Sequence, residues 1–493
     1  MLPADTPDHG PGLPAAVCET HIGIVFLVGD LAYKMKKPVN LGFLDFSTRE
    51  AREAVCHREV GLNRRLAPDV YLGVADISGP DGTPCDHLVV MRRMPQDRRL
   101  TALVRRRDPL DGTVRDIARE LAGFHATADR GPHIDADGTR DALTARWRAS
   151  FEQVRRFHGT VVDPATADEI EQRTEAFLRG RHDLFARRIA LGRIIDGHGD
   201  LLADDIFCLP DGPRILDCLE FDDHLRHVDG IDDIAFLAMD LERLDAPELG
   251  TLLYQHYLRF TGDTPPDALW HHYLAYRAFV RVKVACHRYN QGDHLAKAVA
   301  AEYTAIALRH TRLTSVRLIL VGGLPGSGKT TLASALAERL GATLLHSDLV
   351  RKEILGKPGT WHAPAPYQEG IYSPEQTTST YHELTQRARE LLALGETVVL
   401  DASWSSGQHR ALAAEIATGT HSELVALECV APDSVRTNRI VTRTNSPSDV
   451  TPRIARAMAA AANPWPEAFP VDTTRSITNS VAQALHAIAP HSR

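Results

Sequence analysis

The feature that most constrains the fold is the segment Gly323–Thr330, which reads GLPGSGKT and directly follows an apolar run over residues 316–322. The apolar run predicts a buried parallel strand, and the leucines at 332, 336 and 340 recur at helical spacing after the loop. A strand, a glycine-rich loop and a helix N-terminus in this order direct backbone N–H groups at phosphate oxygens. The sequence therefore predicts a phosphate-binding loop in a domain built on a parallel sheet.

The residues expected to contact a nucleotide form one continuous segment. Lys329 occupies the position that reaches the β- and γ-phosphates, and the hydroxyl of Thr330 occupies the position that holds Mg²⁺. The loop and the residue after Thr330 supply the other predicted contacts: Gly323, Leu324, Pro325, Gly326, Ser327, Gly328 and Thr331.

The chain is too long for a single ordinary hydrophobic core. It has 493 residues, so we expect two large domains or three smaller ones. A helical pattern gives way to the strand of the phosphate loop near residues 308–316, which marks the best boundary. We therefore predict a disordered start rich in Pro and Gly over residues 1–14, one domain over 15–310 and a second over 315–493.

Composition and charge exclude several classes of protein. The net charge of -8 disfavours a protein that coats nucleic acid through a general basic surface, so a nucleic-acid partner is not the expected one, although a local groove stays open as an alternative. The 7 cysteines form no C-x-x-C pair, which predicts reduced thiols and no zinc site. No apolar run reaches the roughly 18 residues of a membrane span, and the N-terminus lacks the pattern of a secretory signal. These features predict a cytoplasmic protein without a membrane partner.

A hairpin and a helix open the first half of the chain. Residues 22–28 and 31–36 flank Gly29-Asp30, a turn pair typical of a β-hairpin. Ser47-Thr-Arg-Glu50 has the pattern of a capping box, which predicts the start of a helix. The apolar stripe of this helix consists of Ala51, Val55, Leu62 and Leu66.

Glu59 lies on the same apolar stripe, where an unpaired buried charge would be costly, so it needs a cationic partner. Lys34, which ends the second strand of the hairpin, is the favoured partner, and Lys36 and Lys37 are alternatives. Alternation along a strand places Lys34 and Lys36 on the same face. Because such a lysine–glutamate pair holds the α- and β-phosphates in kinase-like sites, Lys34 and Glu59 are predicted nucleotide contacts.

A second chemical motif in the first half is His198-Gly-Asp200. An H-x-D loop supplies the carboxylate that accepts the proton of a substrate hydroxyl during phosphoryl transfer. A predicted hairpin follows over residues 206–216, and Asp217 comes directly after it, where a kinase-like site places an Mg²⁺ ligand. We therefore predict Asp200 as the catalytic base and Asp217 as a metal ligand. The alternative is that both are ordinary loop and strand-end carboxylates.

At these residues the first half resembles the aminoglycoside-phosphotransferase-like branch of the protein-kinase fold. The whole chain is similar to two-domain bacterial proteins that join such a domain to a P-loop kinase-like, AAA-family ATPase domain. The resemblance implies an α+β bilobal kinase-like fold followed by a P-loop α/β fold with a mainly parallel sheet. It also implies ATP, Mg²⁺ and transfer of the γ-phosphoryl group to a hydroxyl. The segments that carry it read ETHIGIVFLVGDLAYKMKKP, HGDLLADDIFCL, ILDCLEFDD and GLPGSGKTT.

The sequence departs from the wider kinase pattern in two places. Asp205 stands where a metal-binding asparagine is expected, and it remains a predicted metal ligand because an aspartate can also bind Mg²⁺. No G-x-G-x-x-G loop precedes Lys34, and Glu19-Thr-His-Ile-Gly23 stands there instead. Activity of the first half is therefore open, and a domain that binds its ligand without catalysis is the alternative.

Two carboxylates follow predicted strands in the second half. Asp348 comes shortly after a strand over residues 343–345, where P-loop kinases place a group that orients or deprotonates the acceptor. It also suits the N-cap of the following helix. Asp401 ends the apolar strand 397–400 in the manner of a Walker B aspartate, which predicts a role in holding Mg²⁺.

Three arginines at helical spacing follow farther on. Arg436, Arg439 and Arg443 share one face of a predicted helix. A mobile lid that brings arginines onto the transferring phosphate would use this arrangement, so Arg439 and Arg443 are predicted catalytic residues. The alternative is a solvated basic helix face.

Together these residues predict an ATP- and Mg²⁺-dependent phosphotransferase with two nucleotide sites and a small hydroxylic acceptor, such as a sugar or an aminoglycoside-like molecule. One alternative is an ATP-hydrolysing sensor whose first domain binds a ligand without catalysis. A nucleic-acid 5′-end kinase is another, since the second domain looks like the gluconate-kinase, zeta-toxin and polynucleotide-kinase group. That alternative needs an aromatic-lined channel. The aromatic residues expected near the substrate are Trp361, Tyr367, Tyr372 and Trp404.

Overall fold

The fold was analysed in a computed structural model, which describes residues 15–19, 23–40, 45–358, 361, 368–442 and 450–488. The predicted disordered start at residues 1–14 lies outside the described residues. The chain divides into two compact units. The first contains Met1–Ala167, Ala186–Pro265 and Tyr273–His310, and the second contains Asp168–Phe185, Pro266–His272 and Thr311–Arg493.

The first unit begins with an antiparallel sheet of five strands in the order β1-β2-β3-β5-β4. The turn Gly29-Asp30 joins β2 to β3 with Gly29 at a φ of 57°, which confirms the predicted hairpin. Buried apolar residues such as Val60 and Val89 connect the following helix, α1, to the sheet. The strands are β1 (Ala15–Glu19), β2 (Gly23–Val28), β3 (Leu31–Lys36), β4 (Tyr71–Ser78) and β5 (Pro84–Arg92).

Helix α1 (Arg49–Asn63) begins one residue later than the capping box predicts. Its N-cap is Thr48, whose hydroxyl accepts from the backbone N–H of Ala51 at 3.2 Å. Ser47 is not the cap, because its hydroxyl donates to Asp45 instead. Two adjacent hydroxyl residues can both serve as a cap, and only the local chain path selects between them. Leu66 also lies beyond the end of the helix, although it is buried as predicted.

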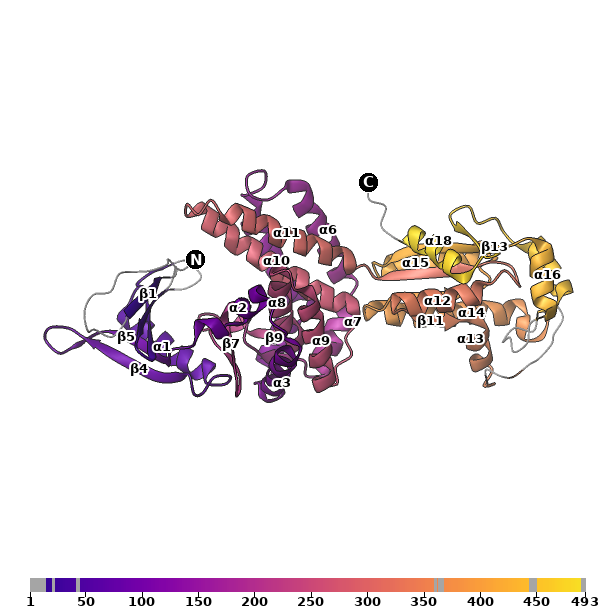
Figure 1. The fold of residues 1–493 in the computed structure, drawn as a ribbon. Coiled ribbons are helices and arrows are strands. Elements are labelled where there is room, and N and C mark those ends of the chain that lie inside the picture. Colours follow the sequence, from indigo (N-terminus) through magenta and orange to yellow (C-terminus); the bar gives the residue numbers. More distant parts are fainter. Residues whose placement is uncertain are drawn as a thin grey trace. The chain divides into compact units, whose positions relative to one another are not determined.

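A mainly helical region follows the sheet (Figure 1). Two small antiparallel ribbons lie within it, β6–β9 and β7–β8, and the second is the hairpin predicted over residues 206–216. The antiparallel sheet with its helix comes before this helical region in the chain, which is the order of parts that the prediction of a bilobal fold requires. The short strands are β6 (Ile194–Asp196), β7 (Ile206–Leu209), β8 (Gly212–Ile215) and β9 (His227–Asp229). The α-helices are α2 (Leu100–Arg106), α3 (Asp111–Thr127), α4 (Pro132–Asp135), α5 (Arg140–Arg155), α6 (Pro164–Arg179), α7 (His182–Ala190), α8 (Gly230–Arg243), α9 (Pro247–Thr261), α10 (Asp267–Asn290) and α11 (Ala296–Leu313). Single 3₁₀ turns are η1 (Gln96–Arg98), η2 (Ala136–Gly138), η3 (Ala203–Asp205) and η4 (Asp223–Leu225).

The second unit is built on a parallel sheet in the order β11-β12-β10-β13-β14. The strand that precedes the phosphate loop, β10, is central and fully buried over Leu318–Gly322, as the apolar run predicts. Leu332 and Leu336 of α12 pack on this sheet with residues of α18. The strands are β10 (Arg317–Gly322), β11 (Thr343–His346), β12 (Val398–Asp401), β13 (Glu423–Val430) and β14 (Phe469–Asp472). The helices are α12 (Lys329–Leu340), α13 (Ser347–Ile354), α14 (Pro374–Ala393), α15 (Gly407–Gly419), α16 (Asp433–Thr442), α17 (Pro452–Ala461) and α18 (Ile477–Ile488), with the turn η5 (Gly370–Tyr372). Among the described residues, no helix combines the length and the hydrophobicity that crossing a lipid bilayer requires.

Candidate functional site

The phosphate loop has the backbone conformation that its glycines allow. Gly326 and Gly328 adopt φ values of 78° and 90°, in the left-handed region that favours glycine. A Cβ atom at Gly326 would lie 2.5 Å from the carbonyl oxygen of Arg436, so helix α16 approaches the loop closely at this point. Gly328 is the N-cap of α12, and the loop therefore leads directly into the helix N-terminus. Backbone N–H groups at such a terminus are free to bind an anion.

Thr473, which follows β14, fixes the loop from outside. Its hydroxyl donates to the carbonyl oxygen of Ser327 at 2.5 Å. The hydroxyl of Ser327 is buried and has no hydrogen-bond partner in the structure. An unsatisfied buried hydroxyl is costly, and a phosphate oxygen in the loop would offer it a partner.

A pocket of about 730 Å³ opens at this loop. Its lining includes nine of the predicted site residues, which come from four separate segments of the second unit. They are Pro325, Gly326, Gly328, Lys329, Thr330, Thr331, Asp348, Asp401 and Arg439. Gly323, Leu324 and Ser327 belong to the loop but are not among the lining residues. Arg443 lies outside the described residues.

Asp401 ends β12 and is nearly buried beside the loop. Its Oδ2 atom lies 2.9 Å from Nδ1 of His346, while its Oδ1 atom is buried and has no hydrogen-bond partner. An oxygen in this state suits Mg²⁺ or a water bound to it, so the residues present fit the ion. Sequence reasoning missed His346, although both residues end neighbouring parallel strands and are register partners.

Asp348 also lines the pocket, from the first turn of α13. Its carboxylate accepts from Nη1 of Arg351 at 2.7 Å, and the Arg351 guanidinium stacks over the ring of Tyr372. The alternative interpretation as an N-cap is wrong, because His346 occupies that position and no side chain caps the helix. Asp348 is therefore a pocket carboxylate oriented by an arginine.

Arg439 and Arg436 lie on α16 but differ in their surroundings. Arg439 donates from Nη2 to the carbonyl of Thr473 at 2.7 Å and from Nη1 to the carbonyl of Gly326 at 3.4 Å. Arg436 donates to Asp433 and does not line the pocket. Arg439 thus donates a hydrogen bond to the phosphate loop itself. This contact differs from the alternative interpretation, in which the arginines of this helix form a solvated basic face.

The aromatic residues expected near the substrate separate into two groups. Tyr372 lines the pocket, whereas Trp404 is completely buried and donates its backbone N–H to the hydroxyl of Tyr381. Tyr381 does line the pocket, and its ring stacks on His409 at 3.9 Å. The expectation that Trp404 lies near the substrate was wrong, because its side chain is part of the hydrophobic core. Tyr367 lies outside the described residues.

In the first unit, Glu59 is completely buried and contacts two lysines. Oε1 lies 2.8 Å from Nζ of Lys34, and Oε2 lies 2.6 Å from Nζ of Lys36. Lys34 also donates to Asp217 at 2.5 Å, while the buried Lys36 donates to Glu220. The structure therefore brings the predicted Lys34, Glu59 and Asp217 together, and it adds Lys36 and Glu220 as a second, more deeply buried pair.

The charges in this cluster stabilise one another. Burial favours the neutral form of Lys34, but Asp217 and Glu59 raise its pKa well above the usual value. Burial likewise opposes the charge on Glu59, but Lys34 and Lys36 hold the pKa of this carboxyl below its usual value. Both side chains consequently stay ionised at neutral pH.

The loop that carries Asp200 is held by a buried aspartate of α8. Asp233 accepts from the backbone N–H groups of His198 and Gly199, at 2.7 and 2.9 Å. His125 lies 3.1 Å from the same carboxylate. Sequence reasoning missed Asp233, because only the fold brings α8 to a loop more than thirty residues earlier in the chain.

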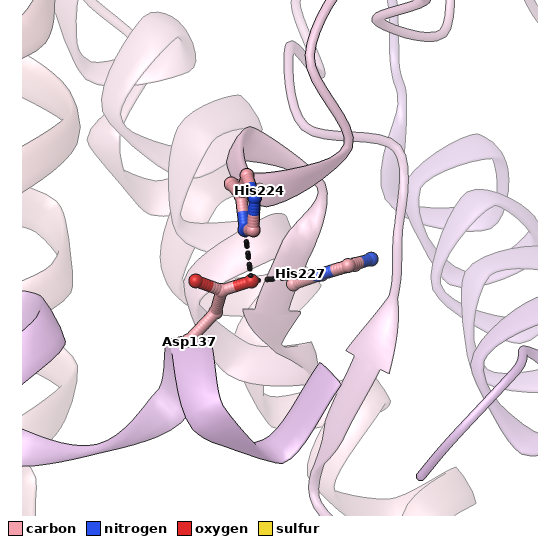
Figure 2. Close-up of side chains that lie close together, drawn as sticks. All are labelled: Asp137, His224 and His227. Carbon is pink, nitrogen blue, oxygen red and sulfur yellow. Dashed lines mark hydrogen bonds and ion pairs between the residues drawn. The ribbon is translucent and has the colours of Figure 1, made fainter. Parts of the chain in front are cut away.

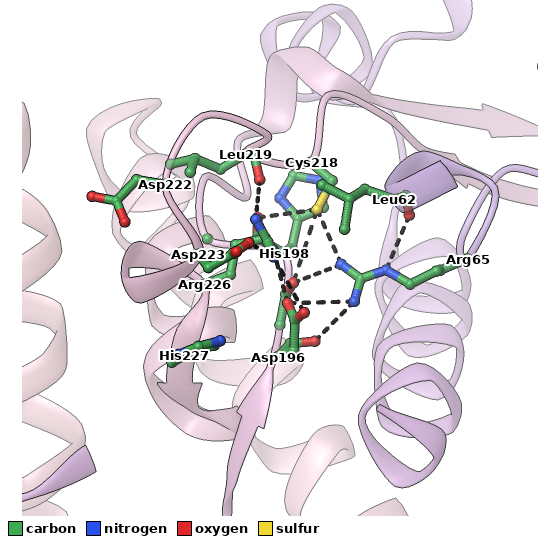
Figure 3. A network of polar contacts seen from close by, with 12 residues as sticks. Leu62, Arg65, Asp196, His198, Cys218, Leu219, Asp222, Asp223, Arg226 and His227 are labelled. Atoms are coloured by element: carbon green, nitrogen blue, oxygen red, sulfur yellow. Dashed lines mark hydrogen bonds and ion pairs between the residues drawn. The ribbon is translucent and has the colours of Figure 1, made fainter. Parts of the chain in front are cut away.

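A network of polar contacts joins this loop to the segment after Asp217 (Figure 3). Nη1 of Arg65 donates to the carbonyl of Asp196 at 3.1 Å. Arg226 donates to the Asp196 carboxylate at 2.7 Å and to the carbonyl of Leu219 at 2.9 Å. The loop and the segment are therefore fixed to the same two arginines.

The predicted base and metal ligands of the first unit act on one another electrostatically. Burial raises the pKa of Asp200, and the charge of Arg281 only partly offsets this. Burial and the charges of Asp217 and Asp200 raise the pKa of Asp205 well above its usual value. A cation between these carboxylates would relieve the repulsion, and Lys34 already pairs with Asp217 in this structure. Their catalytic and metal-binding roles stay predictions.

Known proteins match part of the second unit and nearly the whole chain. A family model described as an AAA domain matches residues 318–465, which include the phosphate loop and Asp401. The uncharacterized protein Rv2004c of Mycobacterium tuberculosis is 44% identical over 476 residues, which span 95% of this chain and 94% of that protein. The uncharacterized protein Mb2027c of Mycobacterium bovis matches over the same 476 residues with 44% identity.

Solved structures overlap different parts of the chain. A gluconokinase from Sinorhizobium meliloti 1021 covers 36% of this chain and 91% of its own, with 19% identity and a TM-score of 0.27. A choline/ethanolamine kinase family protein from Mesorhizobium loti covers 61% of this chain and 92% of its own, with 16% identity and a TM-score of 0.39.

Proposed function

This chain belongs to the family of these mycobacterial proteins, and we propose that it is an ATP- and Mg²⁺-dependent phosphotransferase. Its acceptor is the hydroxyl of a small molecule, such as a sugar or an aminoglycoside-like compound. One observation carries this proposal: Lys329, Thr330, Asp401, Asp348 and Arg439 line one pocket of about 730 Å³. A phosphate loop, a metal carboxylate, a second carboxylate and an arginine are the parts that phosphoryl transfer to a hydroxyl requires.

Each of these residues has a distinct role in the second unit. Lys329 binds the β- and γ-phosphates of ATP, while Thr330 and Asp401 hold Mg²⁺. Asp348 orients the acceptor hydroxyl and accepts its proton, and its ion pair with Arg351 keeps the carboxylate directed into the pocket. Arg439 stabilises the charge that develops on the transferring group. The polar side chains of Ser403, Ser405 and Gln408 in the lining suit a hydroxylic acceptor.

We assign a second nucleotide site to the first unit. Lys34, held by Glu59, contacts the α- and β-phosphates, and Asp205 and Asp217 hold Mg²⁺ there. Asp200 is its catalytic base. The support for this site is the ion-paired cluster around Glu59 together with the buried anchor that Asp233 provides for the Asp200 loop.

The experiment is a transfer assay with γ-labelled ATP, Mg²⁺ and a panel of sugars, aminoglycosides and oligonucleotide 5′-ends. Lys329→Ala should abolish transfer by the second unit, and Asp348→Asn should reduce the rate about 10²–10⁴-fold while ATP still binds. Asp200→Ala should remove any acceptor that the first unit serves. Lys297→Ala, at an exposed lysine of α11, is the matched control.

The outcomes separate the alternatives. ATP turnover that depends on Lys329 without labelling of any acceptor would instead support an ATP-hydrolysing sensor. Labelling confined to oligonucleotide ends would support a 5′-end kinase. If Asp200→Ala leaves every labelled acceptor unchanged, the first unit has no catalytic role in these reactions.

A further inference from the structure

Two histidines and an aspartate lie together in the first unit (Figure 2). Oδ2 of Asp137 lies 2.8 Å from Nδ1 of His224 and 2.7 Å from Nδ1 of His227. The three side chains come from separate elements, η2, η4 and β9, so only the fold brings them together. Neither nucleotide site uses any of them.

We propose that Asp137, His224 and His227 bind one divalent transition-metal ion. Ligand atoms about 2.0–2.2 Å from an ion, at angles of about 90–110°, lie about 2.8–3.6 Å from one another. The two oxygen-to-nitrogen distances, 2.8 and 2.7 Å, are at or just below the lower end of this range, and all three ligand atoms lie within 4.8 Å of one another. The separation of the two imidazole nitrogens is bounded only by this 4.8 Å, so the two rings would move toward one another as an ion enters.

The chemistry of the donors selects the class of ion. Two imidazole nitrogens with one carboxylate suit Zn²⁺, Fe²⁺, Co²⁺ or Ni²⁺, whereas Mg²⁺ prefers oxygen ligands alone. The site is thus chemically distinct from the carboxylate sites proposed for Mg²⁺. Asp137 and His227 are mostly buried, with side chains 17% and 8% exposed, while His224 is 75% exposed. The open side at His224 leaves room for water to complete the coordination.

Neighbouring contacts hold the backbone of all three residues. Nη2 of Arg146 donates to the carbonyl of Asp137 at 2.8 Å and to that of His227 at 3.4 Å. The carboxylate of Asp222 accepts from the backbone N–H of His224 at 3.0 Å and caps η4. Supports of this kind orient metal ligands and contribute to affinity. Arg146 also lies 3.7 Å from Oδ1 of Asp137, and its charge opposes a cation, which limits the affinity of the site.

When an ion binds, the Nδ1 protons of His224 and His227 must move elsewhere. Without an ion, Oδ2 of Asp137 accepts from Nδ1–H of both rings. An ion bound at Nδ1 requires that this proton leave, and in a neutral ring it moves to Nε2. A charged ring already has a proton on Nε2, so it releases one proton to solvent. No oxidant or other reactant is involved.

The ion would connect two parts of the helical region. His224 and His227 follow Asp217 in the chain, and Arg226 between them is already bonded to Asp196 beside the Asp200 loop (Figure 3). Asp137 belongs to the turn before α5. Binding would therefore fix the segment after Asp217 to the helices. This inference does not depend on either proposed phosphotransferase site.

The test is a Zn²⁺ titration of the full-length, chelator-treated protein without nucleotide, read by competition with a chromophoric chelator. Wild type should bind one equivalent at this site, and His224→Ala and Asp137→Asn should each weaken that binding by at least about tenfold. His57→Ala, at an exposed histidine of α1, should bind as wild type does. A Co²⁺ titration should give visible absorption bands that the two ligand variants lose.

Because His224 is 75% exposed, its substitution should leave folding intact, and circular dichroism checks this. The proposal is overturned if wild type takes up no stoichiometric Zn²⁺. It is equally overturned if folded His224→Ala binds Zn²⁺ as tightly as wild type and keeps the Co²⁺ bands.

Discussion

Nδ1 of His346 lies 2.9 Å from Oδ2 of Asp401, and the two residues are register partners at the carboxyl ends of neighbouring parallel strands. The contact leaves Oδ1 of Asp401 buried and without a hydrogen-bond partner, in a residue that lines the same pocket as Lys329 and Thr330. His346 therefore orients the carboxylate that we assign to Mg²⁺. The pairing of the two strands in the sheet places His346 beside this carboxylate.

Replacing His346 should weaken the Mg²⁺ dependence of the second unit. Without its partner, the Asp401 carboxylate can rotate, so His346→Ala should raise the Mg²⁺ concentration for half-maximal ATP turnover about 10–100-fold. His346→Asn keeps a donor near the position of Nδ1 and should retain most of the affinity. His382→Ala, at an exposed histidine of α14, is the control. An unchanged Mg²⁺ requirement in His346→Ala would show that Asp401 needs no such partner.

The two lysines that contact Glu59 should behave differently when each is replaced by methionine. Lys36 is completely buried between Glu59 and Glu220, so Lys36→Met leaves the buried Glu220 without this partner and Glu59 with Lys34 alone, and it should cost about 3–5 kcal/mol of stability. Lys34 is more exposed, so Lys34→Met should cost less stability but should abolish nucleotide binding by the first unit. Urea unfolding and ATP titration of a Lys329→Ala background separate the two effects. Equal stability losses would contradict this division.

Local motifs carried most of what the sequence could predict. The phosphate loop, its strand and its helix are contiguous, so their chemistry is determined within the single stretch from Arg317 to Leu340. The pairing of Lys34 with Glu59 also followed from alternation along a strand and from an inward-facing carboxylate. The sequence could not predict that Thr48 and not Ser47 is the N-cap of α1. Both residue types suit an N-cap, and the path of the chain before the helix decides which of them caps it.

The partners that fix these motifs come from distant parts of the chain. Thr473 bonds to Ser327 across 146 positions, and Asp233 bonds to His198 across 35. Each contact depends on how helices and strands pack against one another. The spacing of residues along the sequence does not predict that packing. For Trp404 the sequence predicted a place near the substrate that the structure does not show. This aromatic residue is adjacent in sequence to the predicted site but is buried in the core.

A buried histidine should make stability depend on pH. His272 stacks on Phe177 at 4.7 Å, and burial lowers its pKa from 6.5 to about 3. Between these values the unfolded chain binds a proton that the folded chain does not, so stability falls as pH falls below about 6.5, by about 1.4 kcal/mol per pH unit. His272→Phe keeps the ring but removes this slope.

Urea unfolding of both proteins between about pH 5 and about pH 7 measures the difference in slope. Exposed His421→Phe, in the same unit, should show the slope of wild type. Parallel stability curves for wild type and His272→Phe would mean that His272 is protonated in the folded protein.

Arg439 and Arg436 provide a matched pair on one helix for testing stabilisation of the transferring phosphate. Arg439 lines the pocket and donates to the loop carbonyl of Gly326, whereas Arg436 donates to Asp433 outside it. If Arg439 stabilises the transition state, Arg439→Gln should cost about 3 kcal/mol, which is about a hundredfold in kcat. Arg436→Gln should leave kcat within about twofold of wild type, because a surface ion pair contributes about 0–1 kcal/mol. Since Arg439 also contacts the loop, ATP affinity must be measured in parallel: a loss confined to ATP affinity, with kcat unchanged, would make Arg439 a residue that orders the loop and not one that acts on the transferring group.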